Sequence, residues 1–160
     1  MTRRHPLTAE DPGSTPWPLR ADRPDVGRFG WTRHAAGGVP KFHRGVDFVC
    51  AVGAPVFAAH DGRVVRDGEE EGGGGYGQRI YLQAATGLTT VYAHLSVEFL
   101  RVGDAIRAGH CLGLAGRSGN LAHEPTHLHF EVRADLDAAS AINPEHWLHG
   151  LGNVEGVHRA

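Results

Sequence analysis

Residues 78–94 contain Gln78-Arg-Ile-Tyr-Leu-Gln83, a linking stretch, and then Thr89-Thr-Val-Tyr-Ala-His94. Both runs are rich in the β-branched and aromatic residues that favour strands. Between them lies Thr86-Gly87, a dipeptide typical of a turn because glycine tolerates left-handed backbone conformations. The stretch therefore predicts two neighbouring antiparallel strands, and strands of this kind determine the fold of the whole chain.

Similar short strand patterns recur along the sequence. We expect strands at residues 46–50, 56–59, 63–65 and 128–133, and short strands and turns over 100–116. Between these strands we expect a hairpin turn at Asp61-Gly62. We also expect a loop over 31–43 and a short helix or turn that starts at Asn143-Pro144. The chain has 23 glycines in 160 residues, and helix-favouring runs are scarce. This pattern predicts an all-β fold, an antiparallel β sandwich or partly open barrel with little helix.

The composition excludes several classes of protein. A length of 160 residues fits one domain, and the formal net charge of −2 is too small to indicate a nucleic-acid partner. No stretch approaches the about 20 apolar residues that a membrane-spanning helix needs. Cys50 and Cys111 belong to no Cys-x-x-Cys motif, so we expect two buried free thiols, with a disulfide as the alternative.

Candidate chemistry lies in three separate segments: His43-Arg-Gly-Val-Asp47, His94, and His127-Leu-His129. On a strand, residues two or four apart point to the same face. One face of a sheet could therefore bring His43, Asp47 and His129 around a metal ion. Two imidazoles and one carboxylate, with one position left open, are typical ligands of a catalytic zinc.

The two remaining histidines, His94 and His127, suit acid–base roles. One would take a proton from a zinc-activated water, and the other would donate to the developing oxyanion or the leaving amine. Each segment alone has a plain alternative: His94 as a packed histidine, and the His-x-His pair as a surface or core pair. Their joint occurrence favours a site. No His-Glu-x-x-His helix is present, which excludes a thermolysin-type centre.

These residues belong to a longer set of motifs that resembles the lysostaphin/LytM-like zinc endopeptidases of bacterial cell walls. The resemblance covers residues 29–148, in family order and spacing. It is carried by His43-Arg-Gly-Val-Asp47, Pro55-Val-Phe-Ala-Ala-His-Asp-Gly-Arg-Val64, Gly75-Tyr-Gly77, Val91-Tyr-Ala-His-Leu-Ser96, Val102-Gly-Asp104, Ala108-Gly109, Gly116-Arg-Ser-Gly-Asn120 and Thr126-His-Leu-His-Phe-Glu131.

The resemblance implies the antiparallel fold called the duplicated hybrid motif and one zinc ion (Zn2+) per chain. It implies His43, Asp47 and His129 as the zinc ligands and His94 and His127 as catalytic histidines. The implied activity is hydrolysis of peptide cross-links in bacterial peptidoglycan. Two alternatives are a catalytically silent cell-wall-binding or amidase-activating module, which the retention of all these residues disfavours, and a zinc peptidase with a protein or peptide substrate.

One departure from the family bears on the substrate. Family members that cut pentaglycine bridges often carry a tyrosine six residues before the first ligand, where this chain has Gly37. Phe29-Gly-Trp-Thr-Arg-His34 instead resembles the variant of Gram-negative enzymes, in which an arginine faces the reacting carbonyl. This likeness implies Arg33 as an oxyanion-stabilising residue; the alternative is a solvated loop arginine. We therefore expect cleavage of D,D-type stem cross-links rather than polyglycine.

The sequence also suggests an organisation and a place of action. We expect an extended N-terminal arm at 1–28, a zinc endopeptidase domain at 29–148 and a C-terminal tail at 149–160. The basic start is followed by no apolar segment, so we expect no signal peptide in this chain. Because the substrate lies in the periplasm or cell wall, we expect delivery by a phage or secretion system, or prior removal of a signal. Expected partners are peptidoglycan and a delivery machinery or a cognate immunity or inhibitor protein, and we expect a monomer.

Overall fold

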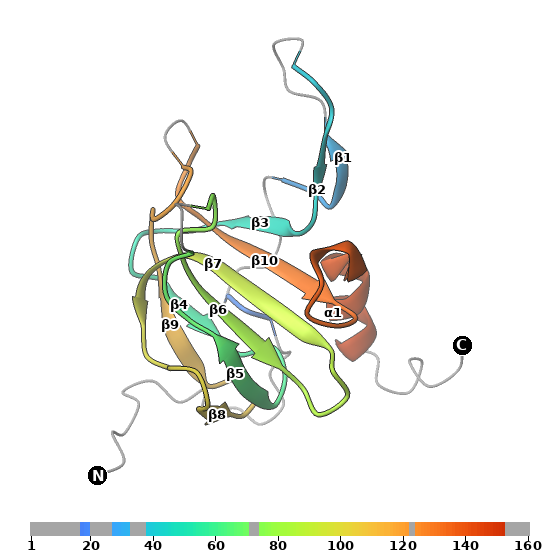
Figure 1. Cartoon of the computed structure of the whole chain (residues 1–160). Helices are drawn as coiled ribbons and strands as arrows, with labels where there is room; N and C mark the ends of the chain where they lie inside the picture. Colours follow the sequence, from blue (N-terminus) through green and yellow to red (C-terminus); the bar gives the residue numbers. More distant parts are fainter. Residues whose placement is uncertain (1–16, 20–26, 33–37, 71–73, 122–123, 153–160) are drawn as a thin grey trace.

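The computed structural model describes residues 17–19, 27–32, 38–70, 74–121 and 124–152 (Figure 1). Within these residues the chain is built mainly of short strands. They are β1 (Gly30–Thr32), β2 (Lys41–His43), β3 (Val46–Val49), β4 (Pro55–Phe57), β5 (Gly62–Arg66), β6 (Gln78–Gln83), β7 (Thr89–Glu98), β8 (Ala105–Ile106), β9 (Cys111–Ala115), β10 (His127–Arg133) and β11 (Ala141–Ile142). The helices are a 3-10 turn, η1 (Ala138–Ser140), and α1 (Pro144–Gly152).

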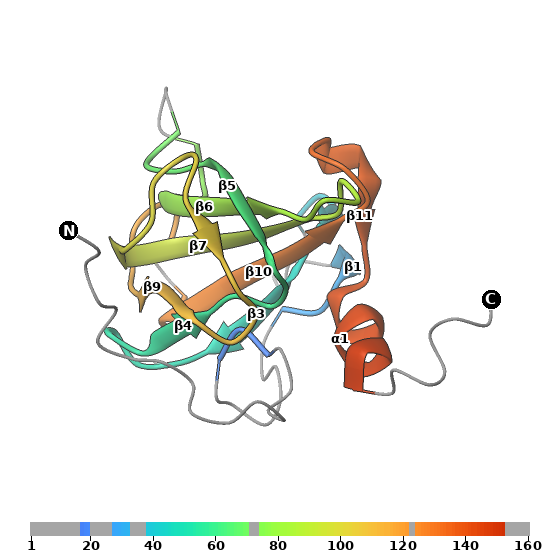
Figure 2. The ribbon, with the colours of Figure 1, turned by 90° about the horizontal axis from the view of Figure 1, so that it is seen from below.

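The main sheet has nine strands, and its longest path runs β11-β10-β7-β6-β5-β8, with every pairing antiparallel. Strands β3 and β11 share one edge of β10, while β9 pairs with β4 and with the second half of β7. The sheet curves without closing, as Figures 1 and 2 show. The prediction of an all-β, partly open antiparallel fold is confirmed.

Strand β7 changes partners in its middle. Its first half pairs with β10 as far as Ala93, and its second half pairs with β9 from Leu95 onward. Between them, His94 has a φ of +62° and is the one described non-glycine residue in the left-handed region. That conformation is sparsely populated by residues with a side chain, and it bends the strand where the two pairings meet.

Strand β10 is buried along its whole length and separates core from site. Its even-numbered residues Leu128, Phe130 and Val132 belong to the hydrophobic core. There Phe130 makes ring contacts with Phe48 and Tyr92, with centroids 6.3 and 5.3 Å apart. Full burial of each such side chain contributes roughly 1.5–3 kcal/mol. By strand alternation, the odd-numbered residues His127, His129, Glu131 and Arg133 face the opposite side.

Several local expectations are wrong. Residues 30–32 and 41–43, expected within a loop or its border, pair as the small β1–β2 sheet. His43 and Asp47 consequently lie on two strands, β2 and β3, rather than on one. The Asp61-Gly62 turn joins no hairpin, because β4 pairs with β9 whereas β5 pairs with β6 and β8.

Other expectations are confirmed. Strands β6 and β7 pair as predicted around a turn that contains Gly87, with a φ of +94°. The helix α1 starts at Pro144. Both cysteines are free as expected, but only Cys111 is buried, whereas Cys50 is half-buried. No helix in the described part of the chain is long and apolar enough to cross a membrane.

A short piece of the predicted N-terminal arm packs on the domain. Leu19 is buried in the core, and the Trp17 ring lies 6.0 Å from that of Phe48 and 5.5 Å from that of His149. The Pro18 carbonyl accepts a hydrogen bond from the Phe57 amide, at 2.8 Å. The division into arm, domain and tail stays a prediction.

Candidate metal centre

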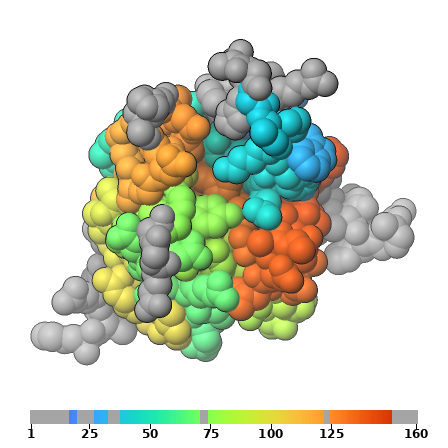
Figure 3. Space-filling model, turned by 45° about the horizontal axis from the view of Figure 1, so that its top comes forward, coloured from blue at the N-terminus to red at the C-terminus, as the bar shows by residue number. Residues whose placement is uncertain are grey.

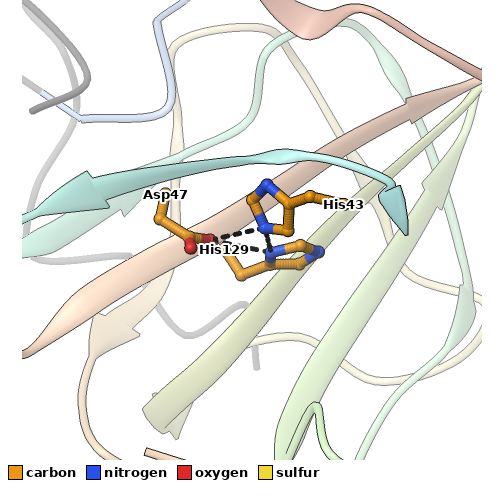
Figure 4. A group of neighbouring side chains, drawn as sticks. All are labelled: His43, Asp47 and His129. Carbon is orange, nitrogen blue, oxygen red and sulfur yellow. Dashed lines mark hydrogen bonds and ion pairs between the residues drawn. The ribbon is translucent and has the colours of Figure 1, made fainter. Parts of the chain in front are cut away.

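Three side chains from different strands converge at one point (Figure 4). His43 ends β2, Asp47 lies in β3 and His129 lies opposite Asp47 in the pairing of β3 with β10. Asp47 Oδ1 is 2.8 Å from His129 Nδ1 and 3.3 Å from His43 Nε2, and the two ring nitrogens are 3.2 Å apart. Strand pairing thus assembles the three groups predicted as metal ligands.

The free nitrogens of both rings point at this shared centre. Nδ1 of His43 lies 2.9 Å from the Arg28 carbonyl oxygen, which can only accept, so Nδ1 carries the proton. In His129, Nε2 donates in the same way to the Glu131 carboxylate, at 2.8 Å. The remaining nitrogens face each other and Asp47, and a cation between them satisfies both lone pairs. Two neutral imidazoles and one carboxylate fit zinc.

The electrostatics favour a cation at the same place. Burial raises the pKa of Asp47, but hydrogen bonds from His129 and His43 outweigh this effect and hold that pKa well below its usual range. Burial lowers the pKa of His129, whereas its hydrogen bonds to Asp47 and Glu131 raise it to a net value of about 9. Without a metal, the two carboxylates therefore hold a proton on His129.

Sequence reasoning did not assign Glu131 a role. Its side chain is fully buried, and Oε1 accepts the hydrogen bond from His129 and another from the Tyr76 hydroxyl. Oε2 accepts a hydrogen bond from Arg133 Nε at 2.7 Å and forms an ion pair with Arg133 Nη2, also at 2.7 Å. Burial raises the pKa of Glu131, but the bond from His129 and the charges of His129 and Arg133 lower it to about 2.

A carboxylate behind a histidine ligand fixes the orientation of the ring and strengthens it as a donor. Residues 127, 129 and 131 alternate along one face of a predicted strand, and this spacing could have placed Glu131 beside His129 from the sequence alone.

The other two predicted histidines lie beside this centre. His94 Nδ1 is 2.8 Å from the Ser118 carbonyl oxygen, and His127 Nδ1 is 2.9 Å from that of Pro125. Both rings therefore donate from Nδ1 to a backbone carbonyl, and their centroids are 5.0 Å apart. His127 Nε2 lies 3.6 Å from Asp47 Oδ1.

The position of His94 is fixed by its surroundings. The Ser118 hydroxyl donates to the Leu95 carbonyl at 2.7 Å and accepts from the Gln78 amide at 3.0 Å, which locks the loop that holds the His94 ring. Burial, with some help from the neighbouring His129 and His127, lowers the pKa of His94 to about 4. His94 is thus a neutral base above that pH.

Arg33 and Glu124 are the two remaining residues that bear on the site. Arg33, the predicted oxyanion-stabilising residue, lies outside the described residues. Glu124, which the sequence did not single out, places Oε2 3.9 Å from His127 Nε2 on the exposed side of the site. Figure 3 shows the β1–β2 pair (blue to cyan), the segment before β6 (green) and the segment before β10 (orange) on one face of the molecule.

Comparison with known proteins identifies the family of the chain. The sequence profile of Peptidase family M23 matches residues 41–144, and the chain belongs to this family of zinc metallopeptidases. The resemblance drawn from the sequence motifs is confirmed.

Two of the individual relatives are also named as peptidases. The DD-carboxypeptidase/endopeptidase Mpg of Neisseria meningitidis is 33% identical over 116 residues, which cover 72% of this chain and 25% of Mpg. The peptidoglycan DD-endopeptidase ShyC of Vibrio cholerae is 33% identical over 98 residues, 61% of this chain and 22% of ShyC. This chain thus matches about a quarter of the length of these relatives.

Among solved structures, the catalytic domain of lysostaphin from Staphylococcus simulans superposes with a TM-score of 0.65 at 32% identity. The superposition covers 78% of this chain and 90% of the lysostaphin domain. The fold is therefore lysostaphin-like, and the match spans nearly all of that domain.

Proposed function

We propose that this chain is a zinc-dependent endopeptidase that hydrolyses the peptide cross-links of bacterial peptidoglycan. The observation that carries the proposal is the convergence of His43 Nε2, Asp47 Oδ1 and His129 Nδ1 beside two more histidines. Each of those two, His94 and His127, commits Nδ1 to a backbone carbonyl. In each ring Nε2 is then the atom left for proton transfer.

In the mechanism we propose, His43, Asp47 and His129 hold the zinc ion. Zinc in a site of this kind acidifies water and polarises a carbonyl oxygen. Nε2 of one of the remaining histidines, His94 or His127, accepts a proton from the attacking water. The other enters the reaction with a second proton, on Nε2, and gives that proton to the amine that leaves when the peptide bond breaks, or offers it as a hydrogen bond to the oxyanion that precedes it.

The positioning of these two histidines is built into the fold. Each ring is held from behind by a carbonyl oxygen, Ser118 for His94 and Pro125 for His127, so neither ring needs to reorganise during the reaction. Arg33 is proposed as an additional oxyanion-stabilising group, on the sequence likeness alone.

For the substrate we propose D,D-type stem cross-links. Support comes from the names of two relatives, the DD-carboxypeptidase/endopeptidase Mpg and the peptidoglycan DD-endopeptidase ShyC. The chain is also similar to the glycyl-glycine endopeptidase ALE-1 of Staphylococcus capitis, with 40% identity over 90 residues. Polyglycine is therefore the competing substrate.

The test is solubilisation of dye-labelled sacculi by the zinc-loaded chain. Sacculi with direct stem cross-links should release dye, and sacculi with pentaglycine bridges should release much less. The control is His94→Ala, which keeps the proposed ligands. Binding of the unchanged chain to sacculi without any release would instead support the silent cell-wall module.

We place the action of this chain in the periplasm or cell wall, where its proposed substrate lies. A monomeric state, the delivery route and a cognate immunity or inhibitor protein stay predictions. Sedimentation of the purified chain checks the prediction of a monomer.

A further inference from the structure

Two consecutive backbone carbonyls contact the metal site from outside the family-matched region 41–144. The Gly27 carbonyl accepts a hydrogen bond from the Asp47 amide at 3.0 Å. The Arg28 carbonyl accepts from His43 Nδ1 at 2.9 Å. One short segment therefore holds two of the three proposed ligands, one through its backbone and the other through its ring.

Gly27 also approaches the carboxylate of Asp47 itself. Its φ is +72°, a conformation that side chains disfavour. A Cβ atom added there would lie 2.3 Å from Asp47 Oδ2 and 2.8 Å from Asp47 Cγ. Any side chain at position 27 therefore displaces the carboxylate, while glycine leaves it in place.

The segment is held on its C-terminal side by ring and strand contacts. Phe29 packs edge-on against Phe42, with ring centroids 5.2 Å apart, and Gly30 pairs with His43 across the β1–β2 sheet. These contacts fix where the Arg28 carbonyl lies relative to the His43 ring.

From this geometry we propose that Gly27 and Arg28 are positioning residues of the zinc centre. The Arg28 carbonyl fixes the proton of His43 on Nδ1 and so presents Nε2 to the metal, and Gly27 leaves room for the Asp47 carboxylate. Groups that orient ligands in this way typically change metal affinity by about 10–100-fold when they are lost. The inference rests on the ligand assignment of the proposed function.

The experiment compares Gly27→Ala with Gly68→Ala in the full chain. Gly68 has nearly the same φ, +74°, but an added Cβ there meets nothing within 4 Å. Both variants carry the same backbone strain, and only Gly27→Ala collides with Asp47. Zinc affinity is measured by competition with a chromophoric chelator, and the rise in melting temperature on adding zinc to chelator-treated protein is measured beside it.

We expect Gly27→Ala to bind zinc about 10–100-fold more weakly and to gain less thermal stability from zinc. Gly68→Ala should keep the affinity and the zinc-dependent gain of the unchanged chain. Arg28→Ala should keep them too, because the exposed Arg28 acts through its carbonyl. Loss of zinc in Arg28→Ala would overturn the backbone assignment.

Two outcomes separate this inference from the proposed function. If the unchanged chain binds no zinc, the ligand assignment fails and this inference fails with it. If the unchanged chain binds zinc and the two glycine variants bind it equally well, only the positioning role fails.

A measurement on the unchanged chain keeps the inference testable if Gly27→Ala does not fold. In the chelator-treated chain, the Asp47 amide should already exchange its hydrogen slowly, because it donates to the Gly27 carbonyl. Fast exchange at this amide without zinc would overturn the role of Gly27.

Discussion

Asp47 Oδ1 lies 2.8 Å from His129 Nδ1, and the two residues stand directly opposite each other in the β3–β10 pair. Residues separated by 82 positions in sequence are thus brought together by strand register alone. A slip of one residue would turn one of them to the other face of the sheet. The core side chains Phe48 and Phe130, which alternate with them, fix that register.

The first prediction concerns the only carboxylate among the proposed ligands. Asp47→Ala should remove the anionic ligand and lower zinc affinity strongly, because neutral histidines alone hold the ion less well. Metal analysis after dialysis checks it. The matched control is Asp135→Asn, an exposed aspartate outside the site. Full zinc retention in Asp47→Ala would contradict the ligand assignment.

A second prediction concerns Glu131, behind the ligand His129. Glu131→Gln should weaken zinc binding by about 10–100-fold, because the neutral amide supports the His129 ring less than a carboxylate does. It should also destabilise the fold, since Arg133 stays buried without its counter-ion; loss of one partner of a buried pair costs roughly 3–5 kcal/mol.

Chelator competition and denaturant unfolding give the two readouts for Glu131→Gln. Glu98→Gln serves as control, because Glu98 pairs with Arg101 away from the site. Equal zinc affinity in Glu131→Gln and Glu98→Gln would show that Glu131 serves the fold alone.

The proposed catalytic histidines should behave differently from the ligands. His94→Ala and His127→Ala should each keep zinc and lose turnover on the order of 10²–10⁴-fold, the range of a general acid or base. The measurements are metal content and initial rate on a cross-linked muropeptide, with His110→Ala as the control outside the site. A variant that loses zinc would prove to be a ligand, and one that keeps its rate would have no catalytic role.

A pH prediction follows from His60, which lies outside the metal centre. Burial lowers the pKa of His60, partly offset by the hydrogen bond and charge of Asp61, and its Nε2 contacts the Thr90 hydroxyl at 2.8 Å. The unfolded chain therefore takes up this proton at a higher pH than the folded chain. The His60 contribution to stability is present above about pH 6.5 and declines as the pH falls through that value toward the lower folded pKa.

Unfolding of the chelator-treated chain by urea, measured between pH 7.5 and pH 5, checks this sign. His60→Gln should reduce the loss of stability over that range compared with the unchanged chain. A steeper loss in His60→Gln would contradict the assignment.

The sequence allowed the strand content and the ligand set to be predicted, because turn signals and spaced histidines are local patterns. It did not reveal that His43 and Asp47 occupy different strands, since the break at Gly45 depends on a tertiary contact. A Cβ at Gly45 would lie 2.3 Å from the Phe130 carbonyl oxygen.

The supporting contacts escaped prediction for a related reason. The carbonyls of Arg28, Ser118 and Pro125 hold three of the site histidines, and a carbonyl group is present in every residue, so its role leaves no mark in the sequence. Glu131 is different, because the alternation of residues 127, 129 and 131 in the sequence puts its side chain on the same face of β10 as the site histidines. Arg33 remains a prediction from sequence likeness.

The central claim is tested most directly by mass spectrometry of a purified, D,D-cross-linked muropeptide dimer incubated with the zinc-loaded chain. We predict conversion of the dimer to its two monomers by addition of one water across the cross-link. The conversion should stop with a chelator, return with added zinc, and be absent in His129→Ala. An intact dimer after incubation with a chain that demonstrably carries one zinc ion would contradict the account.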